Sequence, residues 1–478
     1  MKISLLIPPT IFQENSYGTL KSLSNPQPSI GLAYIAAVLE REGYEVRVID
    51  AYVSSYWLDE ILEKLEGSDI LGISVLSSCA DAAYAVCREV RSRFPEMAII
   101  HGNLHPSLFR EEVLLNNYAD YIVHHEGEIT FLELCNYISG LSRIEEDEIR
   151  GVSYLKNGKV INNITRPFME DLDSLPFPSW HLYDLSKYST DPRTQVVPFA
   201  KELQLLATRG CPNECSFCSS RSEKSQGQKY RMRQPKNIIK EIQYFYEKLE
   251  VTVFNFMDLA FPLAKKHAME FCQLLIDSGL NEKIKWVSEL RVRPLDKELV
   301  SMLKKSGCAR VCFGIESGNN EILKSIKKGF TRDDVFKAVN LCYEAGLEVD
   351  GMFMLGLPGE TPDTLKDTIQ FAIDLDVRFA IFNLFVPYPG CTLYEELKAQ
   401  DKIHFNNWSD FISYPTYSDK QPVYVPDCLS KKELMQYQAK AMRQFYVRPK
   451  FIMRQLKGFR LRYLPHYLSG LKGLLFTR

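Results

Sequence analysis

The stretch that decides the fold is the loop Cys211-Pro212-Asn213-Glu214-Cys215-Ser216-Phe217-Cys218, which comes just after the apolar run 203–208. It places three thiols within eight residues, in the spacing C-x3-C-x2-C. A cubane iron–sulfur cluster takes four thiolates, one for each iron. No fourth Cys and no His lies nearby in the sequence. The spacing therefore predicts a 4Fe–4S cluster with one iron left open to a substrate or cofactor.

Three other interpretations of this loop stay open at this point. Structural zinc usually takes four ligands in paired spacings, which three thiols do not supply. A disulfide would leave one of the three thiols unpaired, and nothing in the sequence marks the chain as secreted. The cysteines could also be unrelated buried residues, although their tight spacing argues against this.

Length and composition limit the class of protein. A chain of 478 residues predicts two or three domains, and 45% hydrophobic and 25% charged residues are ordinary for a soluble globular protein. The formal net charge of -2 argues against nucleic acid as a partner. The N-terminus is too short for an export signal, and no uncharged apolar run reaches 18 residues. We therefore expect a cytoplasmic protein whose nine other cysteines are reduced and mostly buried.

With the aromatic Phe217 before its last Cys, the loop matches the signature of the radical S-adenosylmethionine enzymes, and the resemblance covers roughly residues 1–400. It implies that Cys211, Cys215 and Cys218 hold the cluster. It implies further that the amino and carboxylate groups of S-adenosylmethionine chelate the open iron. An electron from an external flavodoxin- or ferredoxin-type donor would then cleave the sulfonium and yield a 5′-deoxyadenosyl radical.

Residues 1–140 alternate apolar strands with amphipathic helices. Strands are expected at 3–7, 46–50, 70–76, 98–101 and 121–123, and helices at 31–42, 58–65, 80–93 and 129–137. This alternation predicts an α/β, Rossmann-like parallel sheet with helices on both faces. Such sheets bind ligands at the carboxyl ends of their strands. Those ends are the turns 8–9, 77–78, 102–106 and 126–128.

This first domain resembles the cobalamin-binding domain that precedes the radical core in one large subclass of the family. The matching stretches are 28–36, 102–106 and 126–130. The sequence lacks the D-x-H-x-x-G run that supplies an axial imidazole in many cobalamin proteins, and it has Asn103 and His125 where the subclass often has Gly. Cobalamin binding without a His ligand is known in the subclass, so the resemblance still implies cobalamin.

The histidines and acidic residues of these turns also have structural interpretations. His105 could be a ligand to cobalt, but we expect a hydrogen bond that stabilises its turn, because the D-x-H context is absent. His124 and His125 are expected to be surface or loop residues. Glu126 and Glu128 are expected to cap the following helix, whose first turn favours negative charge.

Residues 141–201 are predicted to form a hairpin around Asn157-Gly158 and then a Pro-rich linker, since 171–180 resembles the interdomain linker of the subclass. Residues 202–403 contain six apolar strands that alternate with helices. Six strands are too few for a closed eight-fold barrel. They fit the partial (β/α) barrel of the radical S-adenosylmethionine family, in which chemistry belongs at the carboxyl ends of the strands.

Polar and glycine-rich segments collect at those strand ends. By resemblance, Glu316 would face the ribose and methionine part of S-adenosylmethionine, while Phe217 and the strand 351–356 would lie along its adenine. Asp258 and Arg293 are expected either as further contacts or as members of ordinary salt bridges. The residues predicted to bind this cofactor are Phe217, Asp258, Arg293, Gly314, Glu316 and Gly356. The sequence does not assign a catalytic residue.

Residues 404–478 are expected to be helical and basic. No acidic residue follows Glu433, whereas ten Lys or Arg lie between Lys440 and Arg478 among bulky apolar residues. Such a helix could bind a membrane surface, here the inner face of the membrane, or could pack on the barrel. Only one cysteine, Cys428, follows the core, so an auxiliary iron–sulfur domain is not expected.

Three functions follow from these expectations. The first is a cobalamin-dependent radical methyltransferase that acts on an unactivated carbon of a small-molecule or lipid-like substrate. The second is a radical cyclase, or an oxidative or rearranging enzyme, with the same domains and no methyl transfer. The third is an iron–sulfur electron-transfer protein, which would require a fourth Cys ligand.

Overall fold

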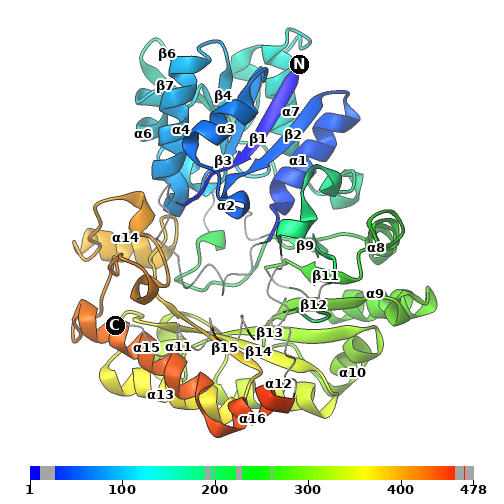
Figure 1. Ribbon diagram of the computed structural model, residues 1–478, viewed down its shortest axis with the longest axis vertical. Coiled ribbons are helices and arrows are strands. Elements are labelled where there is room, and N and C mark those ends of the chain that lie inside the picture. The colour runs from blue at the N-terminus through cyan, green and yellow to red at the C-terminus, as the bar shows by residue number, and fades with distance from the viewer. Residues whose placement is uncertain are drawn as a thin grey trace.

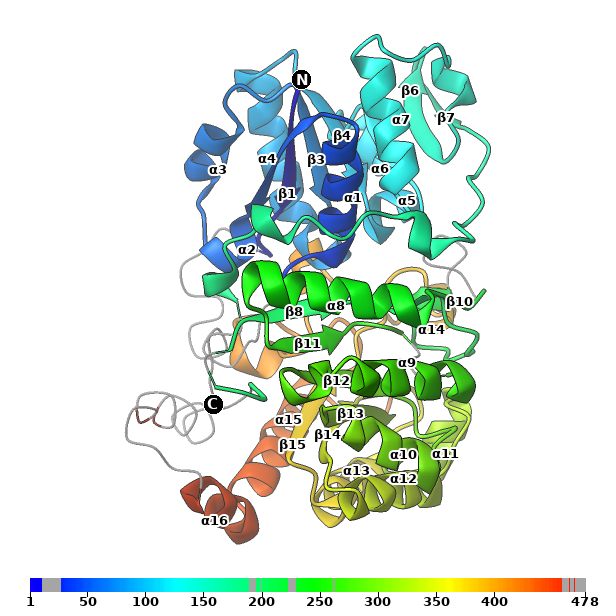
Figure 2. The ribbon, with the colours of Figure 1, turned by 90° about the vertical axis from the view of Figure 1, so that its right-hand side faces the viewer.

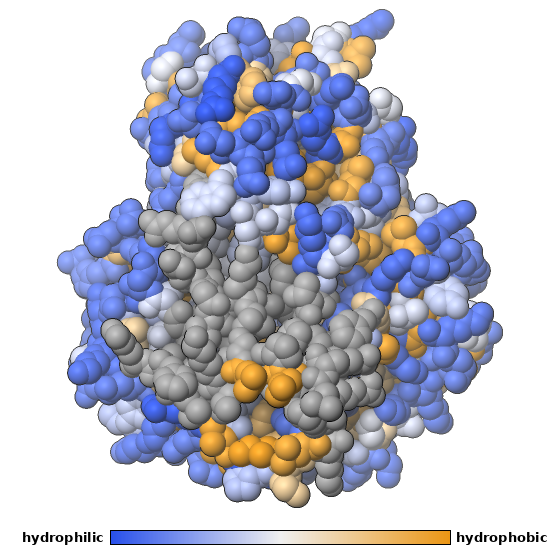
Figure 3. Space-filling view, in the orientation of Figure 1, coloured by the Kyte–Doolittle hydropathy of each residue, from blue (hydrophilic) through white to orange (hydrophobic). Residues whose placement is uncertain are grey.

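The computed structural model describes residues 1–10, 27–188, 195–198, 200–221, 229–259, 261, 263–457, 464 and 468. Two α/β units are stacked along the long axis, and the C-terminal helices lie against the second (Figure 1). The surface on the face seen in Figure 3 is largely hydrophilic over the first unit. No helix formed by the described residues is both long and apolar enough to cross a membrane.

The first unit is built on a seven-stranded sheet in the order β2-β1-β3-β4-β5-β6-β7. Its first five strands are parallel, as predicted. Between each of these strands and the next, a helical connection returns the chain to the same edge of the sheet. The strands are β1 (Lys2–Ile7), β2 (Glu45–Asp50), β3 (Ile70–Ser74), β4 (Ala98–Gly102), β5 (Tyr121–Val123), β6 (Val152–Lys156) and β7 (Lys159–Asn162).

Helices cover both faces of this sheet. Two separate clusters of buried apolar side chains lie on its opposite sides, one under α3 and α4 and the other under α1 and α7. The helices are α1 (Ile30–Arg41), α2 (Ala51–Ser54), α3 (Leu58–Leu65), α4 (Ala80–Arg93), α5 (Leu104–Leu108), α6 (Arg110–Leu115) and α7 (Glu128–Ile138). The short helices α2, α5 and α6 were not predicted, because none is long enough to show a periodic pattern.

The hairpin that the sequence placed in the linker continues the first sheet. Strand β6 pairs antiparallel with β5, with Tyr154 opposite Tyr121. Its inward residues Val152 and Tyr154 are 0% and 2% exposed and join the core under α7. The sheet therefore extends well beyond residue 140, and the connection to the second unit begins after β7.

The second unit is a six-stranded, all-parallel sheet in the order β15-β14-β13-β12-β11-β8. In the part of the chain that the structure describes, β15 and β8 do not pair, so the barrel is open, as expected. The strands are β8 (Glu202–Leu205), β11 (Val253–Phe256), β12 (Lys285–Leu290), β13 (Cys308–Glu316), β14 (Glu348–Leu355) and β15 (Phe379–Leu384).

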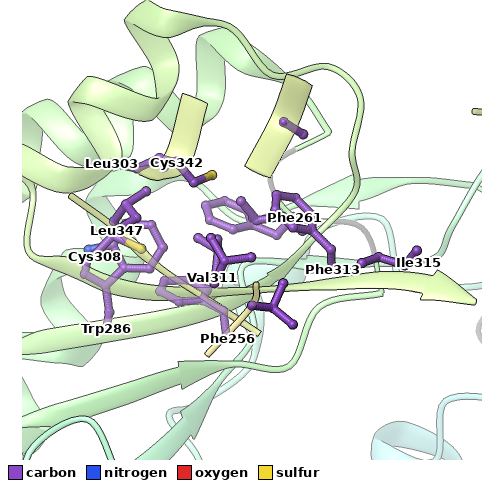
Figure 4. Packing of buried hydrophobic residues seen from close by; sticks show 14 of the residues in the cluster. Phe256, Phe261, Trp286, Leu303, Cys308, Val311, Phe313, Ile315, Cys342 and Leu347 are labelled. Carbon is purple, nitrogen blue, oxygen red and sulfur yellow. The ribbon is translucent and has the colours of Figure 1, made fainter. Parts of the chain in front are cut away.

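A layer of helices covers the outside of this barrel (Figure 2). They are α8 (Pro235–Leu249), α9 (Lys265–Asp277), α10 (Lys297–Lys305), α11 (Asn320–Ser325), α12 (Arg332–Glu344) and α13 (Pro362–Leu375). Alternate strand residues point toward these helices and form the main core. Phe256, Phe261, Trp286 and Phe313 pack there (Figure 4), and the Trp286 indole donates to the Ser306 carbonyl at 3.1 Å, so its polar atom is satisfied.

The C-terminal region adds α14 (Thr392–Ala399), α15 (Lys431–Tyr446) and α16 (Pro449–Lys457). Helix α15 packs on the open edge of the barrel, where the Gln438 amide donates to the carbonyls of Phe382 at 2.8 Å and Ser413 at 2.9 Å. Phe445 and Phe451 are buried in the barrel core. Of the two expectations for the basic tail, packing on the barrel thus holds for α15. The apolar positions 459, 463, 471 and 476 lie outside the described residues.

Gly356 at the end of β14 predicts a test of this packing. Its φ is +88°, and an added Cβ would lie 2.9 Å from the buried side chain of Leu434 in α15. Gly359 has a similar φ of +84° with nothing within 4 Å of an added Cβ. Both Gly→Ala variants carry the backbone strain, but only Gly356→Ala also overpacks. We expect Gly356→Ala to lower the free energy of unfolding by about 1–2 kcal/mol more than Gly359→Ala does in denaturant titrations. Equal losses would show that α15 does not press on this turn.

Candidate active site

The Cys-rich loop leaves the end of β8 and is closed by a two-stranded ladder. Strand β9 (Thr208–Arg209) pairs antiparallel with β10 (Arg231–Met232), so the chain before and after the loop is held together. Cys211 and Cys215 are buried, and Cys218 is half-buried. The loop is also fixed to the barrel, because the Ser216 N–H donates to the Ile326 carbonyl at 3.1 Å and the Leu393 N–H donates to the Ser216 carbonyl at 3.0 Å.

The surroundings of the thiols suit an iron–sulfur cluster. The Asn213 amide donates to the Cys211 sulfur at 3.1 Å, and the Ser220 hydroxyl lies 2.9 Å from the Cys218 sulfur. Burial raises the pKa of Cys218, and the hydrogen bonds from Ser220 oppose this increase. Among the described residues, no three His, Cys, Asp or Glu side chains converge on one point at metal-binding range. The fit to a cluster therefore rests on the chemistry of the ligands. The loop supplies three thiols, and polar groups are placed to hydrogen-bond with the sulfurs of two of them.

Three of the residues predicted to bind S-adenosylmethionine lie together beside this loop. Glu316 has a φ of +68°, and the register between β13 and β14 shifts between Gly314 and Glu316. This irregularity turns the carboxylate toward Lys328, whose ammonium donates to Glu316 Oε1 at 2.7 Å. The same ammonium lies 5.4 Å from the centre of the Phe217 ring. An added Cβ at Gly314 would lie 2.9 Å from Glu316 Oε1 and 3.3 Å from Lys328 Nζ, so a larger residue would press on the ion pair.

Asp258 lies behind the cluster loop. Its side chain accepts hydrogen bonds from the Ala207 N–H at 3.1 Å and the Thr208 hydroxyl at 2.5 Å, and the residue is only 2% exposed. Burial raises its pKa to about 7. Asp258 therefore fixes the end of β8 before the loop, and its contact with S-adenosylmethionine stays a prediction.

The remaining two residues predicted to bind S-adenosylmethionine, Arg293 and Gly356, make other contacts in the structure. The Arg293 guanidinium pairs with Asp334 at 2.6 Å, and its side chain is 63% exposed, so the structure gives it the surface salt bridge that the sequence allowed. The N–H groups of Gly356 and Leu357 donate to the buried carboxylate of Glu360 at 2.6 and 3.0 Å. This turn packs against α15.

The predicted hydrogen-bonding role of His105 is confirmed. Its Nε2 lies 2.8 Å from the Tyr84 hydroxyl, and its Nδ1 lies 3.1 Å from the Ser77 hydroxyl. The ring is fully buried, and burial lowers its pKa to about 3. With both nitrogens engaged, His105 is not placed to ligate cobalt. His124 also uses both nitrogens, on the hydroxyls of Ser107 and Ser153 at 3.1 and 2.7 Å.

The carboxyl ends of the first sheet nevertheless suit a large ring with apolar edges. Leu76, in the turn after β3, is 51% exposed, and Gly102 at the end of β4 has nothing within 4 Å of an added Cβ. In the second unit, Met257 and Leu259, which follow β11, are 39% and 42% exposed. These apolar side chains follow the carboxyl ends of strands, the edge at which sheets of this type bind ligands, and would suit a ligand with apolar edges.

Sequence reasoning missed the contacts of Glu126 and Glu128. The Arg209 guanidinium donates to Glu128 Oε1 at 2.6 Å, and Arg231 donates to both oxygens of Glu126 at 2.8 and 2.9 Å. Both arginines belong to the ladder that closes the cluster loop, whereas Glu126 lies in the turn after β5 and Glu128 is the first residue of α7. The available signal was a cluster of arginines at 209, 231 and 233, on both sides of the loop.

Comparison with known proteins identifies the class. The family model described as the radical SAM superfamily matches residues 205–372, and that of the B12 binding domain matches residues 18–135. The chain is 31% identical over 460 residues to the uncharacterized methyltransferase PH0819 of Pyrococcus horikoshii, covering 95% of both chains. It is 28% identical over 458 residues to the anaerobic magnesium-protoporphyrin IX monomethyl ester cyclase of Cereibacter sphaeroides, covering 94% of this chain and 71% of the cyclase.

Solved structures show the same fold. The cobalamin-dependent S-adenosylmethionine radical enzyme OxsB superposes with a TM-score of 0.72 at 16% identity, covering 98% of this chain and 72% of OxsB. The radical S-adenosylmethionine methyltransferase TsrM from Kitasatospora setae gives a TM-score of 0.69 at 16% identity, covering 94% and 89%.

The chain therefore belongs to the radical SAM superfamily, in the group that carries a B12-binding domain ahead of the radical SAM domain. It is an enzyme, and its cofactors are a 4Fe–4S cluster, S-adenosylmethionine and cobalamin.

The buried Glu360 predicts a pH effect on stability. Burial raises the pKa of its carboxyl from 4.5 to about 8. A raised pKa means that the folded protein holds the proton more tightly, so the stabilisation is present below pH 4.5 and is lost as the pH rises through 8. Glu360→Gln removes this titration. We expect the free energy of unfolding of the variant, relative to the unmodified protein, to increase by at least about 1 kcal/mol between pH 5 and pH 9.

Chemical denaturation across this pH range measures the effect, and the same exchange at the exposed Glu396 is the control. Parallel pH profiles for Glu360→Gln and the unmodified protein would contradict the assignment of a neutral, buried carboxyl to this turn.

Proposed function

We propose that this protein is a radical S-adenosylmethionine methyltransferase that moves a methyl group from cobalamin to an unactivated carbon of a small-molecule substrate. The observation that carries this proposal is the direct contact between the cluster loop and the turn after β5. Arg209 lies two residues before Cys211, and Glu126 and Glu128 lie at a carboxyl-end turn of the B12-binding sheet. This contact supports adjoining sites for the two cofactors, which methyl transfer to a radical formed at one of them requires.

The proposed roles of the residues follow from their places. Cys211, Cys215 and Cys218 hold the cluster, and Phe217 and Glu316 hold S-adenosylmethionine beside it. Lys328 keeps the Glu316 carboxylate oriented through the 2.7 Å ion pair, for which Gly314 leaves room. When bound, S-adenosylmethionine supplies a hydrogen-abstracting radical and cobalamin supplies the methyl group. Asp258 orients the strand that leads into the loop. The positions of Arg293 and Gly356 give no support for cofactor contact.

The inner face of the barrel indicates part of the substrate. On β14, Phe353 and Leu355 pack toward the helices, so the half-buried Met352 and Met354 face the interior. On β15, Ile381 is 37% exposed on the same inner side. An inner face with methionine and aliphatic side chains favours a substrate with an apolar, lipid-like portion. Reduction of the cluster would come from an external flavodoxin- or ferredoxin-type donor.

Contact of the tail with an anionic membrane surface also remains a proposal. Helix α16 exposes Ile452, Met453 and Leu456, which are 42%, 57% and 61% exposed, next to basic residues of the same helix. Apolar and basic side chains on one exposed helix are the features by which such helices bind membrane interfaces. The packing of α15 on the barrel restricts any such contact to residues beyond it.

A second candidate function is radical cyclisation without methyl transfer. It is favoured by the similarity to the anaerobic cyclase over nearly the whole chain. The two reactions use the same cofactors, so the fold does not distinguish them. The electron-transfer alternative is not favoured, because the loop supplies three thiols for four irons.

The cluster assignment predicts the loss of one product. The reconstituted protein, given dithionite and S-adenosylmethionine without oxygen, should form 5′-deoxyadenosine. Replacing Cys211, Cys215 or Cys218 by Ala should lower its yield to background, because the cluster loses a ligand. Cys428→Ala, an exposed cysteine outside the loop, should leave the yield unchanged. Chromatography of the nucleoside products measures this, and full yield from all three loop variants would refute the assignment.

The choice between methyl transfer and cyclisation predicts a difference in products. A methyltransferase must replace the methyl group taken from cobalamin, so S-adenosylhomocysteine should form together with 5′-deoxyadenosine when cobalamin is bound. A cyclase should form 5′-deoxyadenosine alone. Mass spectrometry after incubation with methyl-deuterated S-adenosylmethionine measures both and traces the label. Absence of S-adenosylhomocysteine in cobalamin-loaded protein would move the assignment to the cyclase.

A further inference from the structure

Four charged side chains link the two units in the interior of the molecule. We refer to Arg209, Arg231, Glu126 and Glu128 as the interdomain ion network. Their side chains are 8%, 2%, 10% and 5% exposed, respectively. Arg209 contacts both glutamates, at 2.6 Å to Glu128 and 3.3 Å to Glu126, and Arg231 contacts Glu126 at 2.8 Å. The charges balance, two positive and two negative.

The network is more constrained than a surface salt bridge. The Arg209 guanidinium donates to Glu128 and also contacts Glu126, so its charge is paired with two carboxylates. Arg209 also lies over the Tyr34 ring of α1, with 5.3 Å between its guanidinium and the ring centre. Arg231 donates in addition to the Met169 carbonyl at 2.8 Å, in the connection between the units. Buried pairs contribute little net stability compared with apolar packing, and their best-attested value is to fix one geometry.

Each end of the network lies at a cofactor site. Glu126 and Glu128 flank the turn at the carboxyl end of β5, the edge at which sheets of this type bind ligands. Arg209 precedes Cys211 by two residues, and Arg231 lies in the strand that closes the loop. Gly127 is packed tightly, since an added Cβ would lie 3.2 Å from Ile35 of α1. A ligand that displaces this turn must therefore displace the arginines, and with them the start of the cluster loop.

We propose that the interdomain ion network is a positioning device that couples occupancy of the B12-binding domain to the cluster. The proposal rests on the proposed function only in requiring that both cofactors bind, and it does not depend on methyl transfer. Coupling between two sites is reciprocal. Bound cobalamin should therefore change the electronic environment of the cluster. The assembled cluster should in turn change the affinity of the protein for cobalamin.

The test measures this coupling directly. Hydroxocobalamin is titrated by absorbance into cluster-loaded protein and into Cys211→Ala protein, which lacks the cluster. We expect the dissociation constants to differ by about tenfold. The EPR spectrum of the reduced cluster should also shift when hydroxocobalamin is bound. In an Arg209→Gln background, the two dissociation constants should become equal and the EPR shift should disappear, while the iron content stays the same.

The matched control is Arg166→Gln. Arg166, at the start of the connection, pairs with Glu133 of α7 in a partly buried ion pair that includes no residue of the second unit. It should leave both the affinity difference and the EPR shift unchanged. Arg209→Lys keeps the charge and should therefore retain part of the coupling. If Arg209 acted only through packing, this variant should lose the coupling as Arg209→Gln does.

Glu128→Gln repeats the test from the other side of the interface, which covers the case in which Arg209→Gln does not assemble its cluster. The double variant of Arg209→Gln and Glu128→Gln should lose no more coupling than either single variant, because both remove the same interaction. Cobalamin binding with no effect on the cluster, or full coupling in Arg209→Gln or Glu128→Gln, would overturn the proposal. Failure of the unmodified protein to bind hydroxocobalamin at all would instead count against the proposed function.

Discussion

The architecture depends on a constraint set by buried charge. Arg209 and Arg231 lie in the ladder that closes the cluster loop, and their guanidinium groups are almost fully removed from water. A buried cation must be paired, and the partners here are Glu126 and Glu128 in the other unit. The two units therefore cannot separate or slide without leaving charges unpaired. The carboxyl ends of the B12-binding sheet are held against the loop that carries the three cysteines.

Other contacts hold the same arrangement from different sides. At the far side of the first unit, the Trp408 indole donates to Glu112 at 3.0 Å and stacks edge-on against His105, with 4.6 Å between ring centres. The connection between the units is anchored by Trp180, which is fully buried, and by the Tyr188 hydroxyl, which donates to Asp50 at 2.7 Å. The C-terminal segment thus contacts both units, and the linker packs into the barrel core instead of running free. A rigid frame of this kind is what two cofactors acting in sequence need.

Much of the fold could be predicted because its signals are local. Helices 58–65 and 80–93 begin and end where the hydrophobic period and the breakers place them. The six barrel strands follow from the same pattern. The hairpin 152–162 was predicted as a hairpin, but its membership of the first sheet depends on β5, which is some 30 residues away and leaves no mark on the hairpin sequence.

The site was less predictable, because its geometry comes from distant contacts. Motifs identified the thiols, Phe217, Gly314 and Glu316, but not Lys328, which reaches Glu316 only because of the left-handed backbone at that glutamate. Arg293 looked equivalent to other strand-end residues, and only the structure shows its exposed ion pair with Asp334. The partners of Glu126 and Glu128 lie 105 and 81 residues further along the chain, and the arginines on both sides of the loop did not indicate which acidic residues they pair with.

The central claim is that the three thiolates leave one iron open and that S-adenosylmethionine binds there. The most direct measurement is EPR with electron–nuclear double resonance on the reduced, reconstituted protein, with and without S-adenosylmethionine labelled in its amino and carboxylate groups. The account predicts that the cluster signal changes when the cofactor is added, with hyperfine coupling to the labelled nitrogen and carboxylate. An unchanged signal without that coupling, from a cluster whose four irons all have protein ligands, would contradict it.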